Sequence, residues 1–177
     1  MILIEQPEIN PDPLQYFSCD SGGAKDFVTF HLNKQNIDPQ SSPKIIDLCS
    51  GAGGIAKIFI DLGWKPEDIT CVDKLKPEKP VVNGVRWIYA DLFILGDFIK
   101  RDNILPKEIA ELANSFNIVS LSAGFMGEKL ERSICNFFVK PEGIVIASSS
   151  YRTELDLEEY RSFIGYYDRF KMMRDQL

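Results

Sequence analysis

The chain lacks the residues that mark most metal sites and disulfide scaffolds. Its 177 residues include one histidine and four cysteines, and no two cysteines form a CxxC pair. The thiols, at Cys19, Cys49, Cys71 and Cys135, are far apart, and two fall within segments that we expect to be buried strands. We therefore expect reduced core thiols, with no metal site and no disulfide.

Long hydrophobic runs are missing too. No apolar stretch reaches the roughly 18 residues that a transmembrane helix needs, and no basic and apolar leader opens the chain. These absences predict a cytoplasmic protein, or a soluble piece of a larger one, with no membrane partner.

Positive charge is in short supply. The chain has 20 lysines and arginines against 26 acidic residues, a formal net charge of −6. Proteins that grip nucleic acid usually present a basic surface, so this balance disfavours RNA as a partner and favours a small molecule or another protein. The phosphate loop GxxxxGK[ST] and the dinucleotide fingerprint GxGxxG are absent as well. Binding of some other nucleotide is therefore the weakest hypothesis.

The chain does contain one clear strand, turn and helix, at 44–63. The apolar run Ile45, Ile46 and Leu48 predicts a buried strand, and a glycine-rich turn follows it at 51–54. Apolar residues then recur with helical spacing, at Ile55, Ile58, Phe59 and Leu62. This unit opens nucleotide-binding α/β folds, where backbone N–H groups and a helix N-terminus approach the ligand.

Two acidic residues follow later strands. Asp73 ends the strand expected at 69–73, about twenty residues after the glycines, where a carboxylate accepts hydrogen bonds from ribose hydroxyls. Asp91 lies near the end of a third strand, expected at 85–92.

The three pieces DLCSGAGG (47–54), CVDK (71–74) and YADLF (89–93) resemble motifs I, II and III of class I S-adenosylmethionine-dependent methyltransferases. The resemblance spans roughly residues 44 to 150. It implies that S-adenosylmethionine is the cofactor, with its methionine moiety at the glycine turn, its ribose at Asp73 and its adenine at Asp91. It also implies that Asp47 orients the turn or the methionine amine and that Leu92 packs beside the adenine. The implied cofactor-binding residues are Asp47, Cys49, Ser50, Gly51, Ala52, Gly53, Gly54, Asp73, Lys74, Asp91, Leu92 and Ser120.

The expected fold is a Rossmann-like, doubly wound α/β domain with about five parallel strands in the order 3-2-1-4-5. Residues 1–43 would form an N-terminal arm and a helix at 24–33, and residues 44–177 the methyltransferase-like domain, in one compact unit. Further strands are expected at 116–121 and 143–148, the latter introduced by a turn at 140–142. Prolines make the crossover at 74–80 irregular. A helix from Glu154 to about Arg174 would pack on the sheet through Leu157, Tyr160, Ile164 and Tyr167.

Complete members of the family add a C-terminal β-hairpin, for which the chain shows no sequence. A truncated or shortened form would leave the fifth strand at an edge of the sheet. The C-terminal helix, the N-terminal arm or another subunit would then cover that edge. We therefore expect a homo-oligomer or a protein partner there.

The motifs also resemble those of two narrower branches of the family. The glycine turn resembles the DLFSGAGG of DNA cytosine-C5 methyltransferases, but their Pro-Cys nucleophile is absent. Motifs I to III are most similar to the 2′-O-ribose RNA methyltransferases, which use a Lys-Asp-Lys-Glu tetrad. Only Lys25 matches that tetrad, because its aspartate falls at Ser122, its second lysine near Ala147 or Ser148, and its glutamate has no counterpart.

The loop after the fourth strand has no acid, amide or proline that would hold an acceptor amine. The first hypothesis is therefore an S-adenosylmethionine-dependent methyltransferase of unknown acceptor, with Lys25 as a weak catalytic candidate. The rival hypothesis is a catalytically inactive methyltransferase-like module for binding or assembly.

Overall fold

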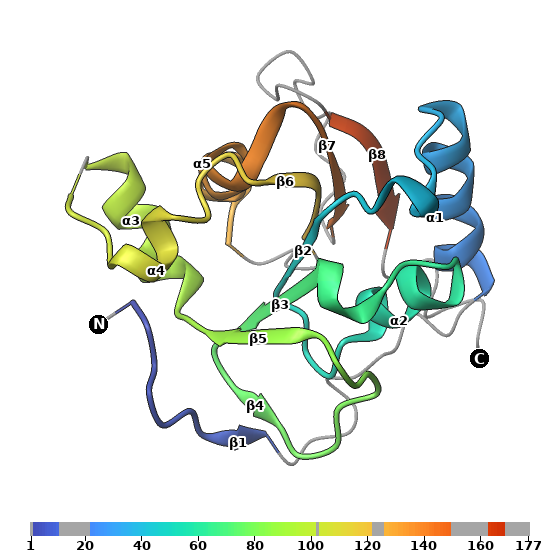
Figure 1. Cartoon of the computed structure of the whole chain (residues 1–177). Coiled ribbons are helices and arrows are strands. Elements are labelled where there is room, and N and C mark those ends of the chain that lie inside the picture. The colour runs from blue at the N-terminus through green and yellow to red at the C-terminus, as the bar shows by residue number, and fades with distance from the viewer. Residues whose placement is uncertain (1, 11–21, 102, 122–125, 150–162, 169–177) are drawn as a thin grey trace.

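The computed structural model of the chain describes residues 2–10, 22–101, 103–121, 126–149 and 163–168. A parallel sheet of six strands forms its centre, in the order β5-β3-β2-β6-β7-β8 (Figure 1). The first five strands confirm the expected order 3-2-1-4-5 and the Rossmann-like fold. The strands are β2 (Ile45–Leu48), β3 (Ile69–Asp73), β5 (Arg86–Tyr89), β6 (Phe116–Leu121), β7 (Val139–Ser149) and β8 (Phe163–Asp168).

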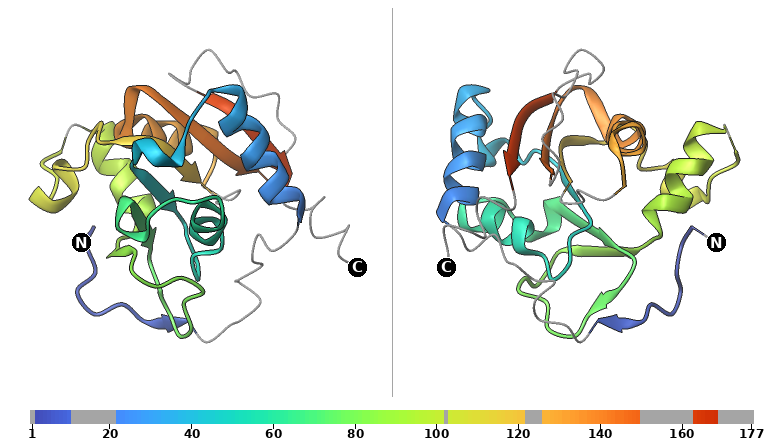
Figure 2. Two further views of the ribbon diagram at one scale, coloured as in Figure 1. Left: turned by 45° about the vertical axis from the view of Figure 1, so that its right-hand side comes forward. Right: turned by 180° about the vertical axis from the view of Figure 1, so that it is seen from behind.

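Helices cover both faces of the sheet, as Figure 2 shows from two sides. Apolar residues alternate between the faces along each strand, so Ile45 packs in the core beneath α1 and α2, and Ile46 packs in the core beneath α3 and α5. Three-residue 3₁₀ helices at Pro39–Ser41 and Pro66–Asp68 precede β2 and β3. The α-helices are α1 (Gly22–Lys34), α2 (Gly54–Asp61), α3 (Leu92–Lys100), α4 (Lys107–Ala110) and α5 (Glu128–Phe138). None of the helices in the described part of the chain is both long and apolar enough to cross a membrane.

The C-terminal helix expected from Glu154 is wrong over residues 163–168. This segment is β8, which pairs in parallel with β7; the other residues of the expected helix lie outside the described ranges. The sequence of β8 is rich in aromatic residues, which favour strands, and Gly165 is unfavourable in the middle of a helix. β7 therefore has a strand on each side. The prediction of a partner at the edge of this strand stays a prediction, but β8 occupies the edge that motivated it.

The turn expected at 140–142 is a β-bulge instead. β7 runs through it, with Val139 opposite Phe116 and Ile144 opposite Ile118, so the extra residues bulge from the ladder. Gly143 fits because a Cβ there would lie 2.8 Å from the carbonyl oxygen of Asn117.

Residues 2–10 of the N-terminal arm are extended, as expected, and residues 2–4 lie along β5 at the opposite edge of the sheet. The Ile4 N–H donates to the Tyr89 carbonyl at 2.8 Å, and the Asp91 N–H donates to the Ile2 carbonyl at 3.0 Å. Farther along, β1 (Ile9–Asn10) pairs with β4 (Lys76–Pro77) of the crossover. The arm thus protects the β5 edge and braces the segments that flank Asp91 and the crossover.

Candidate functional site

The sequence motifs converge where the strand order of the sheet reverses. From β2 the chain adds β3 and then β5 on one side, and it then crosses to place β6 on the other side. Ligands of open α/β sheets bind beyond the carboxyl ends of the strands at such a switch point. The glycine turn directly follows β2, so it lies at the position that the topology favours for a ligand.

The glycine turn has an unusual backbone. Cys49, Gly51 and Gly53 all have positive φ, of 57°, 55° and 93°. The turn is tied to the neighbouring strand, because the Ser50 N–H donates to the Val72 carbonyl at 3.1 Å. Gly53 is the N-cap of α2, so the N-terminus of this helix opens at the turn.

Part of the turn serves packing. A Cβ on Gly53 would lie 2.5 Å from a methyl carbon of Val82, which belongs to the crossover after β4. The Val81 N–H donates to the Ala52 carbonyl at 2.9 Å, which fixes the crossover against the turn. Ala52 and Gly53 are buried there, whereas Gly51 and Gly54 are partly exposed. Packing against Val82 thus explains why a glycine stands at position 53, without any contact to a ligand.

Asp73 joins the glycine turn to the end of β3. Its Oδ2 accepts the Gly51 N–H at 2.8 Å, and its Oδ1 accepts the Leu75 N–H at 3.0 Å. Burial raises the pKa of Asp73 above its ordinary value, and these N–H groups partly offset the rise. The Lys74 N–H also acts on this carboxylate and opposes the rise.

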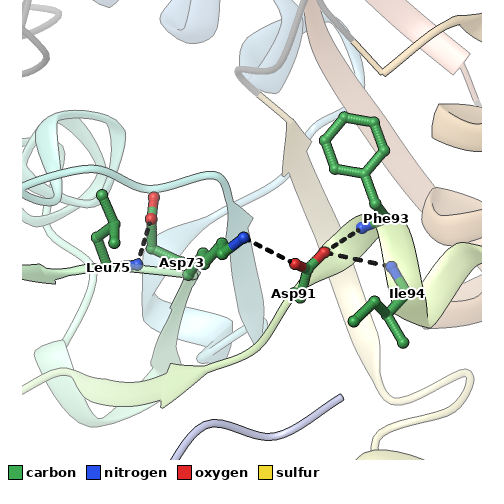
Figure 3. Close-up of polar contacts among 6 residues, drawn as sticks. Asp73, Leu75, Asp91, Phe93 and Ile94 are labelled. Atoms are coloured by element: carbon green, nitrogen blue, oxygen red, sulfur yellow. Dashed lines mark hydrogen bonds and ion pairs between the residues drawn. The ribbon is translucent and has the colours of Figure 1, made fainter. Parts of the chain in front are cut away.

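Asp91 is the N-cap of α3 and also forms an ion pair (Figure 3). Its Oδ1 accepts the N–H groups of Phe93 and Ile94 at 3.0 and 3.2 Å, and the Lys74 Nζ lies 3.1 Å from its Oδ2. Burial alone would raise the pKa of Asp91, but the bonds from Lys74 and the two N–H groups hold it below its ordinary value. Because Oδ1 already accepts two hydrogen bonds, Oδ2 is the oxygen that a ligand can reach, and the Lys74 ammonium lies there in this structure.

Asp47 lies inside the protein. It is completely buried, as is Ser120, its register partner on β6, and neither side chain has a hydrogen-bond partner of good geometry within the described ranges of the chain. Burial raises the pKa of Asp47 to about 7, while the Ser120 hydroxyl and the Ala56 N–H, which face it, oppose the rise. Asp47 lies on the face of the sheet that α2 covers, and its carboxyl faces the first turn of this helix, which follows the glycine turn.

The other predicted residues are placed less directly. Leu92 is only 5% exposed and packs in the core beneath α3, while the next residue, Phe93, is 47% exposed above Asp91 (Figure 3). Lys25 lies near the far end of α2: the hydrogen bond from Lys57 lowers the pKa of Asp61, and Lys25 adds to this effect. An eight-residue helix is about 12 Å long, so Lys25 lies nearer to the Asp61 end of α2 than to the glycine turn.

Two further residues belong to this edge of the sheet. Phe93 supplies an exposed aromatic ring beside Asp91, and its only sequence signal was its place as the last residue of the motif YADLF (89–93). Glu131 of α5 is partly buried, which raises the pKa of its carboxyl. Burial is the main cause that raises the pKa of the Cys49 thiol; the charges of Asp73 and Asp47 add to it, and that of Glu131 adds less. No sequence pattern marks Glu131, because its place depends on how α5 packs against the turn.

Comparison with known proteins leaves the function open. No family model matches the chain, and no curated protein matches it. Among solved structures, glucose dehydrogenase from Haloferax mediterranei is similar over 85% of this chain and 45% of that chain, at 10% identity and a TM-score of 0.45. The PH0226 protein from Pyrococcus horikoshii OT3 is similar over 75% of this chain and 60% of that chain, at 17% identity and a TM-score of 0.42. The glycopeptide N-methyltransferase MtfA, solved with sinefungin, is similar over 78% of this chain and 57% of that chain, at 16% identity and a TM-score of 0.43. The chain spans less than two thirds of each, and likeness at these TM-scores carries no argument about function.

Proposed function

We propose that the chain binds S-adenosylmethionine at the carboxyl edge of β2, β3 and β5 and is a methyltransferase whose acceptor is still to be found. The observation that carries the proposal is the pair of carboxylates, Asp73 and Asp91, at the carboxyl ends of the neighbouring strands β3 and β5. Asp73 is held against the glycine turn by the Gly51 N–H, and Asp91 presents Oδ2, where the exposed Lys74 side chain lies. The two vicinal hydroxyls of a ribose and the single amino group of an adenine match these two acceptors.

The chain's own residues would hold the cofactor. Asp73 would accept the ribose hydroxyls, Asp91 the adenine amino group, and the turn at Gly51 would lie against the methionine part. The predicted contacts at Cys49, Ser50 and Gly54 lie on this same edge of the sheet. When bound, the cofactor supplies an activated methyl group, and the protein aligns the acceptor with it.

Binding of paired analogues tests this assignment. S-adenosylhomocysteine, the product of methyl transfer, should bind, and its inosine analogue should bind about tenfold more weakly or worse, because its 6-carbonyl faces Asp91 with an acceptor instead of a donor. Equal affinity for the two ligands would remove Asp91 from the site.

A second candidate is a binding module without methyltransferase activity. It is favoured by the position of Lys25, which lies nearer to Asp61 than to the glycine turn. This candidate predicts that the purified protein binds S-adenosylhomocysteine but transfers no methyl group from S-adenosylmethionine to small molecules, RNA or proteins of a cell extract. Transfer to a defined acceptor by the wild-type protein would rule it out.

A further inference from the structure

The ion pair between Lys74 and Asp91 connects two separate segments of the site. Lys74 follows β3 directly, and Asp91 begins α3, so the pair spans the carboxyl ends of β3 and β5 (Figure 3). The Lys74 side chain is 63% exposed, whereas that of Asp91 is only 14% exposed. The ammonium group therefore lies on the solvent side of a largely enclosed carboxylate.

The partners of Asp91 differ in how readily a ligand can replace them. The N–H groups of Phe93 and Ile94 are fixed by the first turn of α3, and they occupy Oδ1. The Lys74 ammonium at Oδ2 is carried by a flexible, exposed side chain, and water solvates it once it is released. A donor that arrives from solvent thus meets Lys74 at the one oxygen that still accepts.

We propose that Lys74 is a latch, which closes over Asp91 in the free protein and which the base of the bound nucleoside displaces. This inference rests on the proposed function, because it assumes that Asp91 accepts a hydrogen bond from that base. The latch makes Lys74 a determinant of affinity: the wild-type protein must break the pair before the base can approach along the direction that Lys74 occupies.

Removal of the latch should therefore change the ligand affinity in an unusual direction. Loss of a lysine from a binding site normally weakens binding, but Lys74→Met should strengthen it. An exposed ion pair is worth little, so the expected gain in affinity is about two- to fivefold. The salt concentration provides a second test. Raising it from about 0.05 M to about 1 M screens the ion pair, so it should strengthen ligand binding to the wild-type protein and leave binding to Lys74→Met unchanged.

Calorimetric titration with S-adenosylhomocysteine tests the latch, since this ligand lacks the positive sulfonium of S-adenosylmethionine and removes a confounding charge effect. Lys76→Met is the matched control: its side chain is exposed on β4, and the substitution makes the same change in charge two residues away. It should bind as the wild type does. In an Asp91→Asn background, which keeps an N-cap for α3, Lys74→Met should have no effect.

The outcomes separate the latch from the proposed function. The latch is supported if Lys74→Met binds S-adenosylhomocysteine more tightly than the wild type does, and if this difference in affinity becomes smaller at high salt. Equal or weaker binding by Lys74→Met, with a wild-type protein that binds, overturns the latch and leaves the proposed function standing. Failure of both proteins to bind the ligand overturns the proposed function and the latch with it.

Discussion

Asp47 of β2 and Ser120 of β6 are register partners on neighbouring parallel strands, and both side chains are completely buried. A buried carboxylate without well-formed hydrogen bonds resists ionisation, which is why the pKa of Asp47 is raised to about 7. The ionisation of Asp47 therefore makes the stability of the strand that precedes the glycine turn depend on pH.

The stability of the protein should fall as the pH rises from about 4 to about 7. The folded state holds the Asp47 proton up to a pH of about 7, whereas the unfolded chain releases it near 3.8, so ionisation in this window favours unfolding. Each pKa unit is worth about 1.4 kcal/mol, which sets an upper limit of about 4 kcal/mol for the loss. Urea unfolding at several pH values measures it.

Asp47→Asn should remove most of that pH dependence and should be more stable than the wild type at pH values above 7. Asp61→Asn, a change at the exposed end of α2, should leave the fall intact above pH 4. If Asp47→Asn showed the same slope as the wild type, the pH dependence would have to come from other groups.

Substitution of Gly53 should disturb the turn for two separable reasons. Gly53→Ala places a Cβ 2.5 Å from Val82 and forces alanine to adopt a φ of 93°. Backbone strain of this kind costs about 1–3 kcal/mol, and the collision adds to it. Thermal unfolding of the variant measures the sum.

Gly127→Ala separates the two effects. Gly127 also has a positive φ, of 81°, but none of the residues that the structure describes lies within 4 Å of the added Cβ. Gly127→Ala should therefore lose only the stability that corresponds to backbone strain, and Gly53→Ala should lose more. Val82→Ala should lessen the cost of Gly53→Ala; strictly additive effects of the two changes would mean that Val82 does not fill the space in front of the turn.

The N-terminal arm should contribute to stability through Ile2. Ile2 is 2% exposed and packs in the core that contains Leu92 and Leu95, so Ile2→Ala should cost about 2 kcal/mol or more. Ile9 lies on the same arm but is 62% exposed, and Ile9→Ala should change the free energy of unfolding by about 0.5 kcal/mol or less. Equal effects of the two substitutions would show that the arm is not anchored by Ile2.

Loss of the Asp73 carboxyl should affect both the turn and the ligand. Asp73→Ala removes the acceptor of the Gly51 and Leu75 N–H groups and the carboxylate that we assign to the ribose hydroxyls. We expect lower thermal stability and at least about tenfold weaker binding of S-adenosylhomocysteine. A variant with lower stability but unchanged affinity would place the ribose elsewhere.

Much of the sheet was predictable, because its signals are local. The apolar runs that form β2, β3 and β6 lie between turn residues, and their parallel order follows from the resemblance of the three motifs. The helices α1, α3 and α5 also follow from spacing, with Leu130 and Ile134 of α5 buried as a helical face predicts.

The rest depends on contacts between distant parts of the chain. The apolar stripe near the C-terminus fits a helix as well as a strand, and only pairing with β7 decides that Phe163–Asp168 is β8. The arm has no pattern that selects the β5 edge, since its bonds to Tyr89 and Asp91 are backbone bonds. The acids at 73 and 91 were predictable as a pair, but their partners Gly51 and Lys74 were not.

Calorimetric titration of the wild-type protein with S-adenosylhomocysteine, with NAD as the comparison ligand, tests the central claim most directly. The account predicts micromolar binding of S-adenosylhomocysteine and no binding of NAD. Absence of S-adenosylhomocysteine binding, or binding of NAD in its place, would contradict the assignment of Asp73 and Asp91 to this cofactor.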